Sequence, residues 1–129
     1  MIDGIDLGWF GIDAPSIPCL SIAVQMAQKL HACTDQYDGD GRENDRVRDL
    51  ADLWLLESLL SAGGLAEVRT EVIDTFQRRA KHIWTPTPVI TDMWRKDYPK
   101  SAGEAAGAPA TVEEATDYVV GLIARVDQA

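Results

Sequence analysis

Apolar residues recur at spacings of three and four along most of the chain, and this period constrains the fold more than any other feature of the sequence. The clearest segment opens with Thr111 and Glu114, which form the capping-box pattern of a helix N-terminus. Its apolar stripe consists of Ala115, Tyr118, Val119, Leu122, Ile123 and Val126. No long stretch beyond the N-terminal residues alternates with a period of two. We therefore expect a mostly α fold of about five helices, with a short extended or β segment at the N-terminus.

Capping residues, glycines and prolines set the limits of the expected helices. Ser21 is a suitable N-cap for a first helix that runs to about Thr34, after an extended segment near residues 17–20. A second helix is expected at about 44–61, ending before Gly63 and Gly64. Its lower half is apolar all round, which predicts the central, buried helix. Further helices are expected at 65–82, 91–97 and after 111, with a small-residue linker at 101–109. The length fits a single helical domain spanning residues 1–129.

The charge balance limits the classes of partner. The 21 acidic and 12 basic residues give a formal net charge of −9, which repels phosphate backbones at long range. Any contact with RNA therefore has to come from a local basic patch. The longest dense apolar stretch, residues 53–60, is much shorter than the roughly 18 residues of a membrane span. Two cysteines and an acidic start without a leader pattern predict a cytoplasmic protein that does not engage a membrane.

Lys29 lies within the apolar stripe of the first expected helix, together with Ile22, Met26 and Cys33. A lysine in such a stripe can pack its stem against the core while its ammonium reaches solvent at the edge of the domain. Alternatively, this face borders a cleft, where a compact positive charge can hold the phosphates of a nucleotide. The residue pattern alone leaves both interpretations open.

An acidic strip runs along the second expected helix, where Asp45, Asp49 and Asp52 follow one another at spacings of four and three. Like charges at these spacings repel, and Arg46 and Arg48 lie near enough to pair with them. The strip is either a solvated acidic face or a metal or cation site.

The third expected helix ends in a basic cluster of Arg78, Arg79 and Lys81, with Trp84 close behind. Cations at this end compensate the helix dipole, which is a purely structural role. The same residues are candidates for RNA binding, because the cations can contact the backbone and Trp84 can stack on a base.

Two other patterns are not interpreted as metal sites. The acidic loop at residues 38–41 begins like a calcium loop, but Arg42 and Glu43 occupy positions that need an oxygen ligand and a glycine. His31 and His82 are interpreted as isolated from each other and from any cysteine pair, which argues against zinc. His31 is expected to project opposite Lys29.

The sequence resembles the AbiEii/AbiGii family of nucleotidyltransferase toxins. The resemblance begins with IPCLS at 17–21, AQKLHA at 27–32 and GRENDRVRDLADL at 41–53. It continues with TFQRR at 75–79, followed by His82, Pro86, Trp94 and Tyr98. The order and spacing of these segments carry the resemblance, which covers almost the whole chain.

This resemblance implies a toxin of a bacterial toxin-antitoxin pair, with a cognate antitoxin as its partner. The family uses a nucleoside triphosphate and Mg²⁺ to add nucleotides to the acceptor end of tRNA. On that basis Lys29 serves the nucleotide phosphates, Asp49 is the downstream catalytic acid and Asp52 is its motif companion. Arg46 and Arg48 are assigned with Lys29 and Asp52 to nucleotide binding. Phosphoryl-group transfer needs such groups, because an acid beside a metal or attacking hydroxyl and a cation on phosphate stabilise the reacting charges.

The chain departs from the family in its N-terminal part. Members carry an upstream Gly-Ser turn and two aspartates separated by one residue, which hold the metal ions. Asp3, Asp6 and Asp13 have neither that spacing nor a Gly-Ser partner. We therefore expect the equivalent of the C-terminal lobe, with the N-terminal catalytic lobe absent, no metal site within the chain by itself, no tight binding of Mg²⁺ or nucleotide, and no activity alone. The alternative is a non-catalytic protein-interaction module or homodimer derived from that lobe.

Overall fold

The computed structural model describes residues 21–35, 44–104 and 107–129. Its helices are α1 (Ile22–Thr34), α2 (Arg48–Ser58), α3 (Gly64–Arg79), α4 (Asp92–Glu104) and α5 (Val112–Asp127). No strand occurs in these ranges, so the prediction of a mostly α fold with about five helices is confirmed for them. The extended segment expected near 17–20 lies outside the described residues. No helix in the described part of the chain is long and apolar enough to cross a bilayer.

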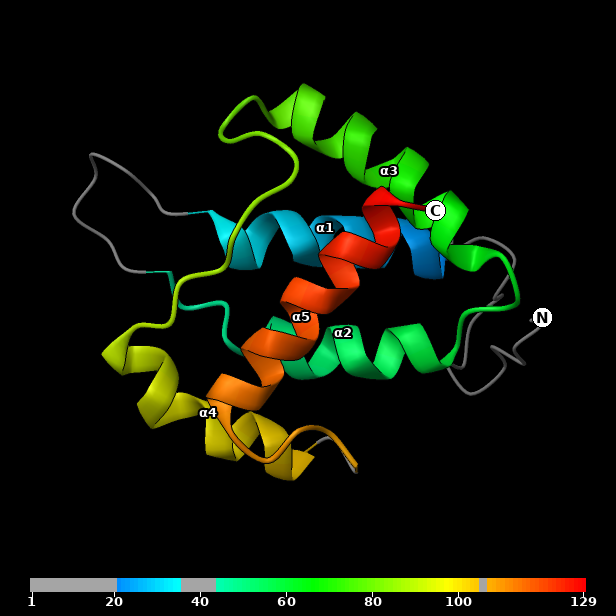
Figure 1. The fold of residues 1–129 in the computed structure, drawn as a ribbon. Coiled ribbons are helices and arrows are strands. Elements are labelled where there is room, and N and C mark those ends of the chain that lie inside the picture. The colour runs from blue at the N-terminus through cyan, green and yellow to red at the C-terminus, as the bar shows by residue number, and fades with distance from the viewer. Residues whose placement is uncertain (1–20, 36–43, 105–106) are drawn as a thin grey trace, which may run out of the picture.

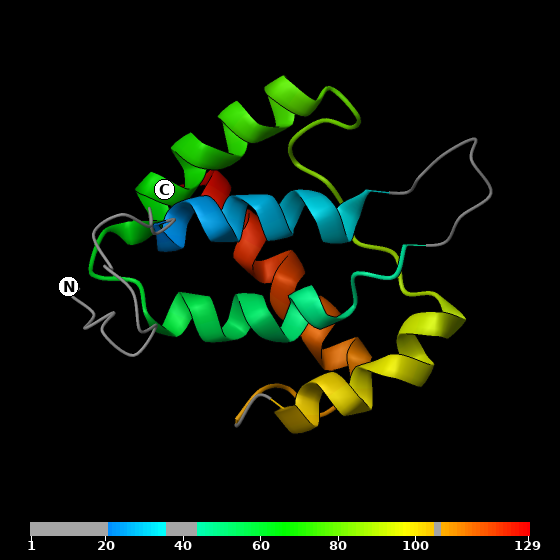
Figure 2. The same ribbon diagram turned by 180° about the vertical axis from the view of Figure 1, so that it is seen from behind.

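The helix α1 is the centre of the fold. It lies between α2 and α3, while α5 crosses over them and α4 lies beside α2 (Figure 1; seen from behind in Figure 2). Both α2 and α3 pack on α1 and not on each other. Met26, Ala27 and Leu30 of α1 are fully buried, whereas Leu59 at the end of α2 is mostly exposed. The helix α2 does pack against three others, α1, α4 and α5, but the burial expected of it holds only in its first half, at Leu50, Ala51 and Leu53.

Local capping explains where α1 and α5 begin. The Ser21 hydroxyl accepts a hydrogen bond from the backbone N–H of Val24 at 3.1 Å, as expected for an N-cap. At α5, the Glu114 N–H donates to the Thr111 hydroxyl at 3.1 Å and the Glu114 carboxylate accepts from the Thr111 N–H. Both halves of the predicted capping box are therefore present.

The helix α2 is shorter than predicted at both ends. It begins at Arg48 instead of Asn44, because the side-chain oxygen of Asn44 accepts from the Arg46 N–H at 2.8 Å and forms a local turn that competes with helix. It ends at Ser58, before Gly63 adopts a positive φ of 81° at the start of α3. Glycine tolerates that conformation, so the chain can reverse there.

The helix α4 is longer than predicted and runs through Pro99 to Glu104. A proline inside a helix removes one backbone hydrogen bond, which is why the sequence favoured an earlier end. Trp94 and Tyr98 are fully buried on one face of α4, while Pro99 is exposed. The burial of two large aromatic side chains thus outweighs the local cost of the proline.

Candidate functional site

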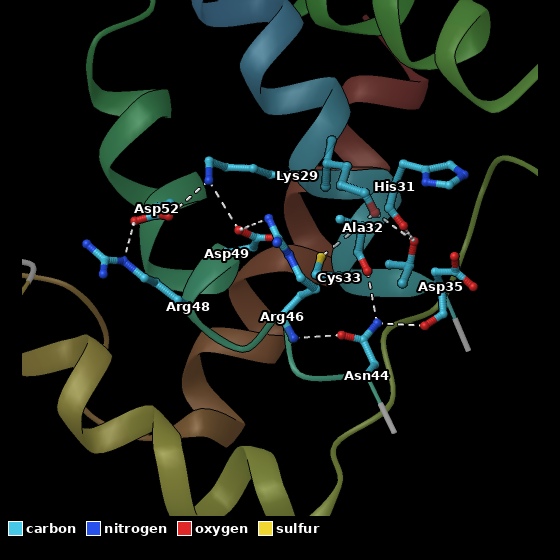
Figure 3. Close-up of polar contacts among 12 residues, drawn as sticks. Lys29, His31, Ala32, Cys33, Asp35, Asn44, Arg46, Arg48, Asp49 and Asp52 are labelled. Carbon is cyan, nitrogen blue, oxygen red and sulfur yellow. Dashed lines mark hydrogen bonds and ion pairs between the residues drawn. The ribbon is translucent and has the colours of Figure 1, made fainter. Parts of the chain in front are cut away.

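Lys29 and two aspartates meet where α1 packs on α2. The Lys29 ammonium lies 3.2 Å from Oδ1 of Asp49 and 3.0 Å from Oδ2 of Asp52 (Figure 3). Only 25% of the Lys29 side chain and 4% of the Asp49 side chain are exposed. The Lys29 stem is thus packed between the helices while its ammonium is paired with two carboxylates at the surface, an arrangement that is compatible with both interpretations left open by the sequence.

Two arginines complete this group. Arg46 donates from Nε to the second oxygen of Asp49 at 3.0 Å, so Asp49 receives a cation on each oxygen. Arg48 lies 3.8 Å from Asp52 and 3.5 Å from Glu104 of α4. We call Lys29, Arg46, Arg48, Asp49 and Asp52 the Lys29 cluster. Together with the exposed Asp45, which precedes α2, they line an open depression of about 440 Å³.

The neighbouring charges in the cluster determine the protonation state of Lys29. Partial burial acts to lower the pKa of Lys29, but the neighbouring carboxylates of Asp49 and Asp52 outweigh it and raise the pKa above its usual value. The amine is therefore a cation at neutral pH. The depression offers both positive donors, which suit phosphate oxygens, and carboxylate oxygens, which suit a hard cation.

The donor set for a metal is incomplete within the described ranges. They contain no group of three or more His, Cys, Asp or Glu side chains that could hold an ion. Asp49 and Asp52 nevertheless provide the oxygen donors that Mg²⁺ prefers, and Mg²⁺ is commonly held by one or two carboxylates together with substrate phosphates. The residues therefore fit an ion that arrives with a triphosphate better than an ion held by the chain alone.

The three RNA-binding candidates have different surroundings. Arg78 pairs with Asp74 one turn earlier in α3, at 2.8 Å. Arg79 and Lys81 have no carboxylate partner within the described residues. Lys81 lies beyond the helix, which ends at Arg79 because Ala80 takes a left-handed conformation with φ of 51°. The cations with charge available for a ligand are thus Arg79 and Lys81.

Lys81 borders a cavity of about 580 Å³ at the end of α3. Its walls are mainly apolar and aromatic, formed by Ile73, Phe76, Gln77, Ala80, Lys81, His82, Ile83 and Trp84. Ile83 is 81% exposed at its edge. Trp84 is held in place by a hydrogen bond from its indole nitrogen to Asp127 at 2.9 Å. The predicted proximity of Trp84 to the basic cluster is therefore observed, with Lys81 as its cationic neighbour.

The interpretation of His31 and His82 as isolated residues is wrong. Their ring centroids lie 4.6 Å apart, because the packing of α3 on α1 brings together residues that are distant in the sequence. His31 is 2% exposed, and burial together with the nearby His82 and Arg79 lowers its pKa to about 4. Burial also lowers the pKa of His82. As predicted, His31 points to the side of α1 opposite Lys29, toward α3 (Figure 3).

Two residues near the cluster were missed by the sequence analysis. Glu104 reaches Arg48 only because α4 continues past Pro99, and no local pattern indicated that. Asn44 is buried between α1, α2 and α4, and its place in the motif GRENDR was the only available signal.

Comparison with known proteins adds one result. A family model described as nucleotidyl transferase AbiEii toxin, type IV TA system, matches residues 5–120 of the 129-residue chain. No curated protein matches the chain. The matched range includes the Lys29 cluster and the basic end of α3.

Proposed function

Because the chain belongs to the AbiEii nucleotidyltransferase toxin family of type IV toxin-antitoxin systems, we propose that its helices form the C-terminal lobe of a nucleotidyltransferase. In this proposal the Lys29 cluster is one wall of a site that takes a nucleoside triphosphate and transfers its nucleotide to the acceptor end of tRNA. The observation that carries it is the meeting of the Lys29 ammonium with Asp49 and Asp52, at 3.2 and 3.0 Å.

Each residue of the cluster has a proposed role that follows from its chemistry. Lys29 holds triphosphate oxygens as a compact positive charge, and Arg46 and Arg48 extend that positive edge. Asp49 accepts the proton of the attacking hydroxyl or binds an ion beside it, with Asp52 as its neighbour one turn along α2. Mg²⁺ bound with the triphosphate would neutralise phosphate charge during transfer.

The proposal also predicts that this polypeptide is inactive by itself. A Gly-Ser turn followed by two aspartates separated by one residue is not found in its sequence. Without those ligands, the two carboxylates of α2 are too few to position the metal ions and the attacking oxygen. A second lobe with that motif is needed for transfer.

The nucleotide-binding role can be tested by NMR, which detects weak binding. Mg·ATP titrated into the ¹⁵N-labelled chain should shift signals around Lys29 and Asp49, and Lys29→Met should remove most of that response. Lys96→Met is a matched control, because Lys96 is an exposed lysine of α4. Equal responses of the two variants would refute the assignment of Lys29.

A radiolabelled transfer assay tests the requirement for a second lobe. The chain, Mg²⁺ and tRNA are combined with each of the four triphosphates in turn, and no incorporation is expected. Incorporation that is lost in Asp49→Ala would show that the chain is complete for catalysis.

For the acceptor, we propose that RNA contacts the end of α3 through Arg79 and through Lys81, which borders the cavity there. These cations lack carboxylate partners among the described residues, and Trp84, an aromatic side chain of the kind on which bases stack, lines the same cavity as Lys81. Arg78 is paired with Asp74 of the same helix, so Arg78→Glu is the matched control for Arg79→Glu and Lys81→Glu. Fluorescence anisotropy with a labelled acceptor-stem RNA should show weaker binding and a smaller salt dependence for the last two variants only. The same loss in all three would contradict the assignment.

A second candidate function is a non-catalytic interaction module that binds an antitoxin or another copy of the chain. It is supported by Ile83, Val89 and Val120, which are large apolar side chains with substantial exposure. Two measurements together distinguish the functions: light scattering after size-exclusion chromatography, and the NMR titration with Mg·ATP. A dimer that dissociates in Ile83→Asp, with no response of Lys29 to Mg·ATP, would favour the interaction module.

A further inference from the structure

We propose that Asn44 is the positioning residue of the Lys29 cluster, because it fixes the end of α1 against the start of α2. The functional importance of the cluster rests on the function proposed above, whereas the positioning role of Asn44 rests on geometry alone. Asn44 lies just ahead of α2 and is 7% exposed. A buried amide of this kind has to satisfy its donors and acceptor within the protein.

The amide nitrogen of Asn44 caps the end of α1. It donates to the carbonyl oxygen of Ala32 at 2.9 Å and to that of Asp35 at 2.6 Å. Carbonyl groups in the last turn of a helix have no partner within the helix. Asn44 supplies hydrogen bonds to this end of α1 from a segment that follows nine residues later in the chain (Figure 3).

The remaining polar groups of Asn44 fix α2 and α4. Its side-chain oxygen accepts from the Arg46 N–H at 2.8 Å and sets the turn that leads into α2. Its backbone oxygen accepts from the indole nitrogen of Trp94 at 2.8 Å, and Trp94 is fully buried in α4. Asn44 is thus bonded to three parts of the fold and cannot shift without breaking several hydrogen bonds.

These bonds act one turn away from Lys29 in α1 and from Asp49 in α2. Ala32 follows Lys29 by three residues in α1, and Arg46 precedes Asp49 by three residues. Arg46 links Asn44 to Asp49, since its N–H donates to the side-chain oxygen of Asn44 and its Nε donates to Asp49 at 3.0 Å. The register of α1 against α2 therefore sets the contact of Lys29 with Asp49.

The test measures the geometry of the cluster without nucleotide. NMR titration of the Lys29 side chain gives its pKa, which the two carboxylates hold above the usual value. Asn44→Ala should move this pKa toward the usual value, because Asp49 and Asp52 are no longer held at Lys29. Tyr98→Phe is the matched control, since it removes one hydrogen bond of 2.7 Å to the Pro109 carbonyl and touches no member of the cluster.

A second variant keeps the test decisive if Asn44→Ala does not fold. Asn44→Ser keeps a hydroxyl that can accept from Arg46 but is too short to donate to both carbonyls of the α1 end, so a smaller shift in the same direction is expected. Unchanged pKa values of Lys29 in folded Asn44 variants, or an equal shift in Tyr98→Phe, would overturn the proposal.

Nucleotide binding provides an independent readout. If the cluster binds a triphosphate, Asn44→Ala should weaken the affinity for Mg·ATP by about tenfold to a hundredfold, the range typical of losing a residue that orients the ligands of a site. Tyr98→Phe should leave it unchanged, and so should Asn44→Ala if Asn44 has no positioning role. Absence of any response in the wild-type chain would refute the proposed function, while the pKa comparison would still decide the role of Asn44.

Discussion

The contact between Lys29 and Asp49 makes a quantitative prediction for a double-mutant cycle. Lys29→Met, Asp49→Asn and the double variant remove the charges one at a time while keeping side chains of similar size. The interaction free energy is the part of the destabilisation that is not additive. We expect it to be favourable and roughly 2 kcal/mol.

This magnitude follows from the distance and the exposure of the pair. At 3.2 Å, Coulomb attraction is about 5 kcal/mol for an effective dielectric constant of about 20 and about 1 kcal/mol in water. Asp49 is almost fully buried, which favours the larger value, whereas Lys29 is one quarter exposed and Arg46 shares the carboxylate. Asp52 is as exposed as Lys29, so its coupling to Lys29 should be smaller, at about 1 kcal/mol.

Urea unfolding at neutral pH measures both cycles. The coupling of Lys29 to Asp49 should change little with added salt, because a buried pair is poorly screened. A coupling below about 0.5 kcal/mol, the value typical of exposed pairs, would refute this reasoning. A larger coupling to Asp52 than to Asp49 would refute it as well.

Three further predictions concern the stability of the fold. As the pH falls from about 6.5 to about 4, up to about 3 kcal/mol of unfolding free energy should be lost, since the unfolded chain protonates His31 before the folded chain does. His31→Phe should flatten this part of the urea midpoint curve, and an unchanged slope would contradict the assignment. Pro99→Ala should stabilise the chain by about 1 kcal/mol, because Pro99 is exposed inside α4, and a lower melting temperature would be the opposite result. Thr111→Ala should cost about 1 kcal/mol through loss of the capping box, whereas Thr70→Ala on the exposed face of α3 should not.

Local sequence signals were sufficient where local chemistry decides the structure. Ser21 and Thr111 were identified as caps because their partners lie within four residues. Pro99 favoured an earlier end of α4 than the structure has. The burial of Trp94 and Tyr98, which outweighs the cost of the proline, depends on how α4 packs and has no local signal. The helix α2 starts later than predicted because Asn44 forms a local turn with the Arg46 N–H, and hydrogen bonds to α1 and α4, which no local pattern indicates, hold Asn44 in that position.

The candidate site was predictable only in part. The resemblance pointed to Lys29 and Asp49, and the spacing of Asp49 and Asp52 placed both on one side of their helix. No pattern in the sequence indicated that Lys29 would bond to both carboxylates, because that depends on the register of α1 against α2. The neighbouring rings of His31 and His82 were missed because their contact is purely tertiary.

Every cation of the Lys29 cluster already faces a carboxylate, counting Glu104 of α4 as a partner of Arg48. A bare triphosphate would have to compete with these carboxylates for the same cations, so the field that attracts it is weak. A divalent ion that engages the carboxylates would release the cations for the phosphates. Thermodynamic linkage then requires that nucleotide and ion act as mutual effectors, each increasing the affinity of the other by the same factor.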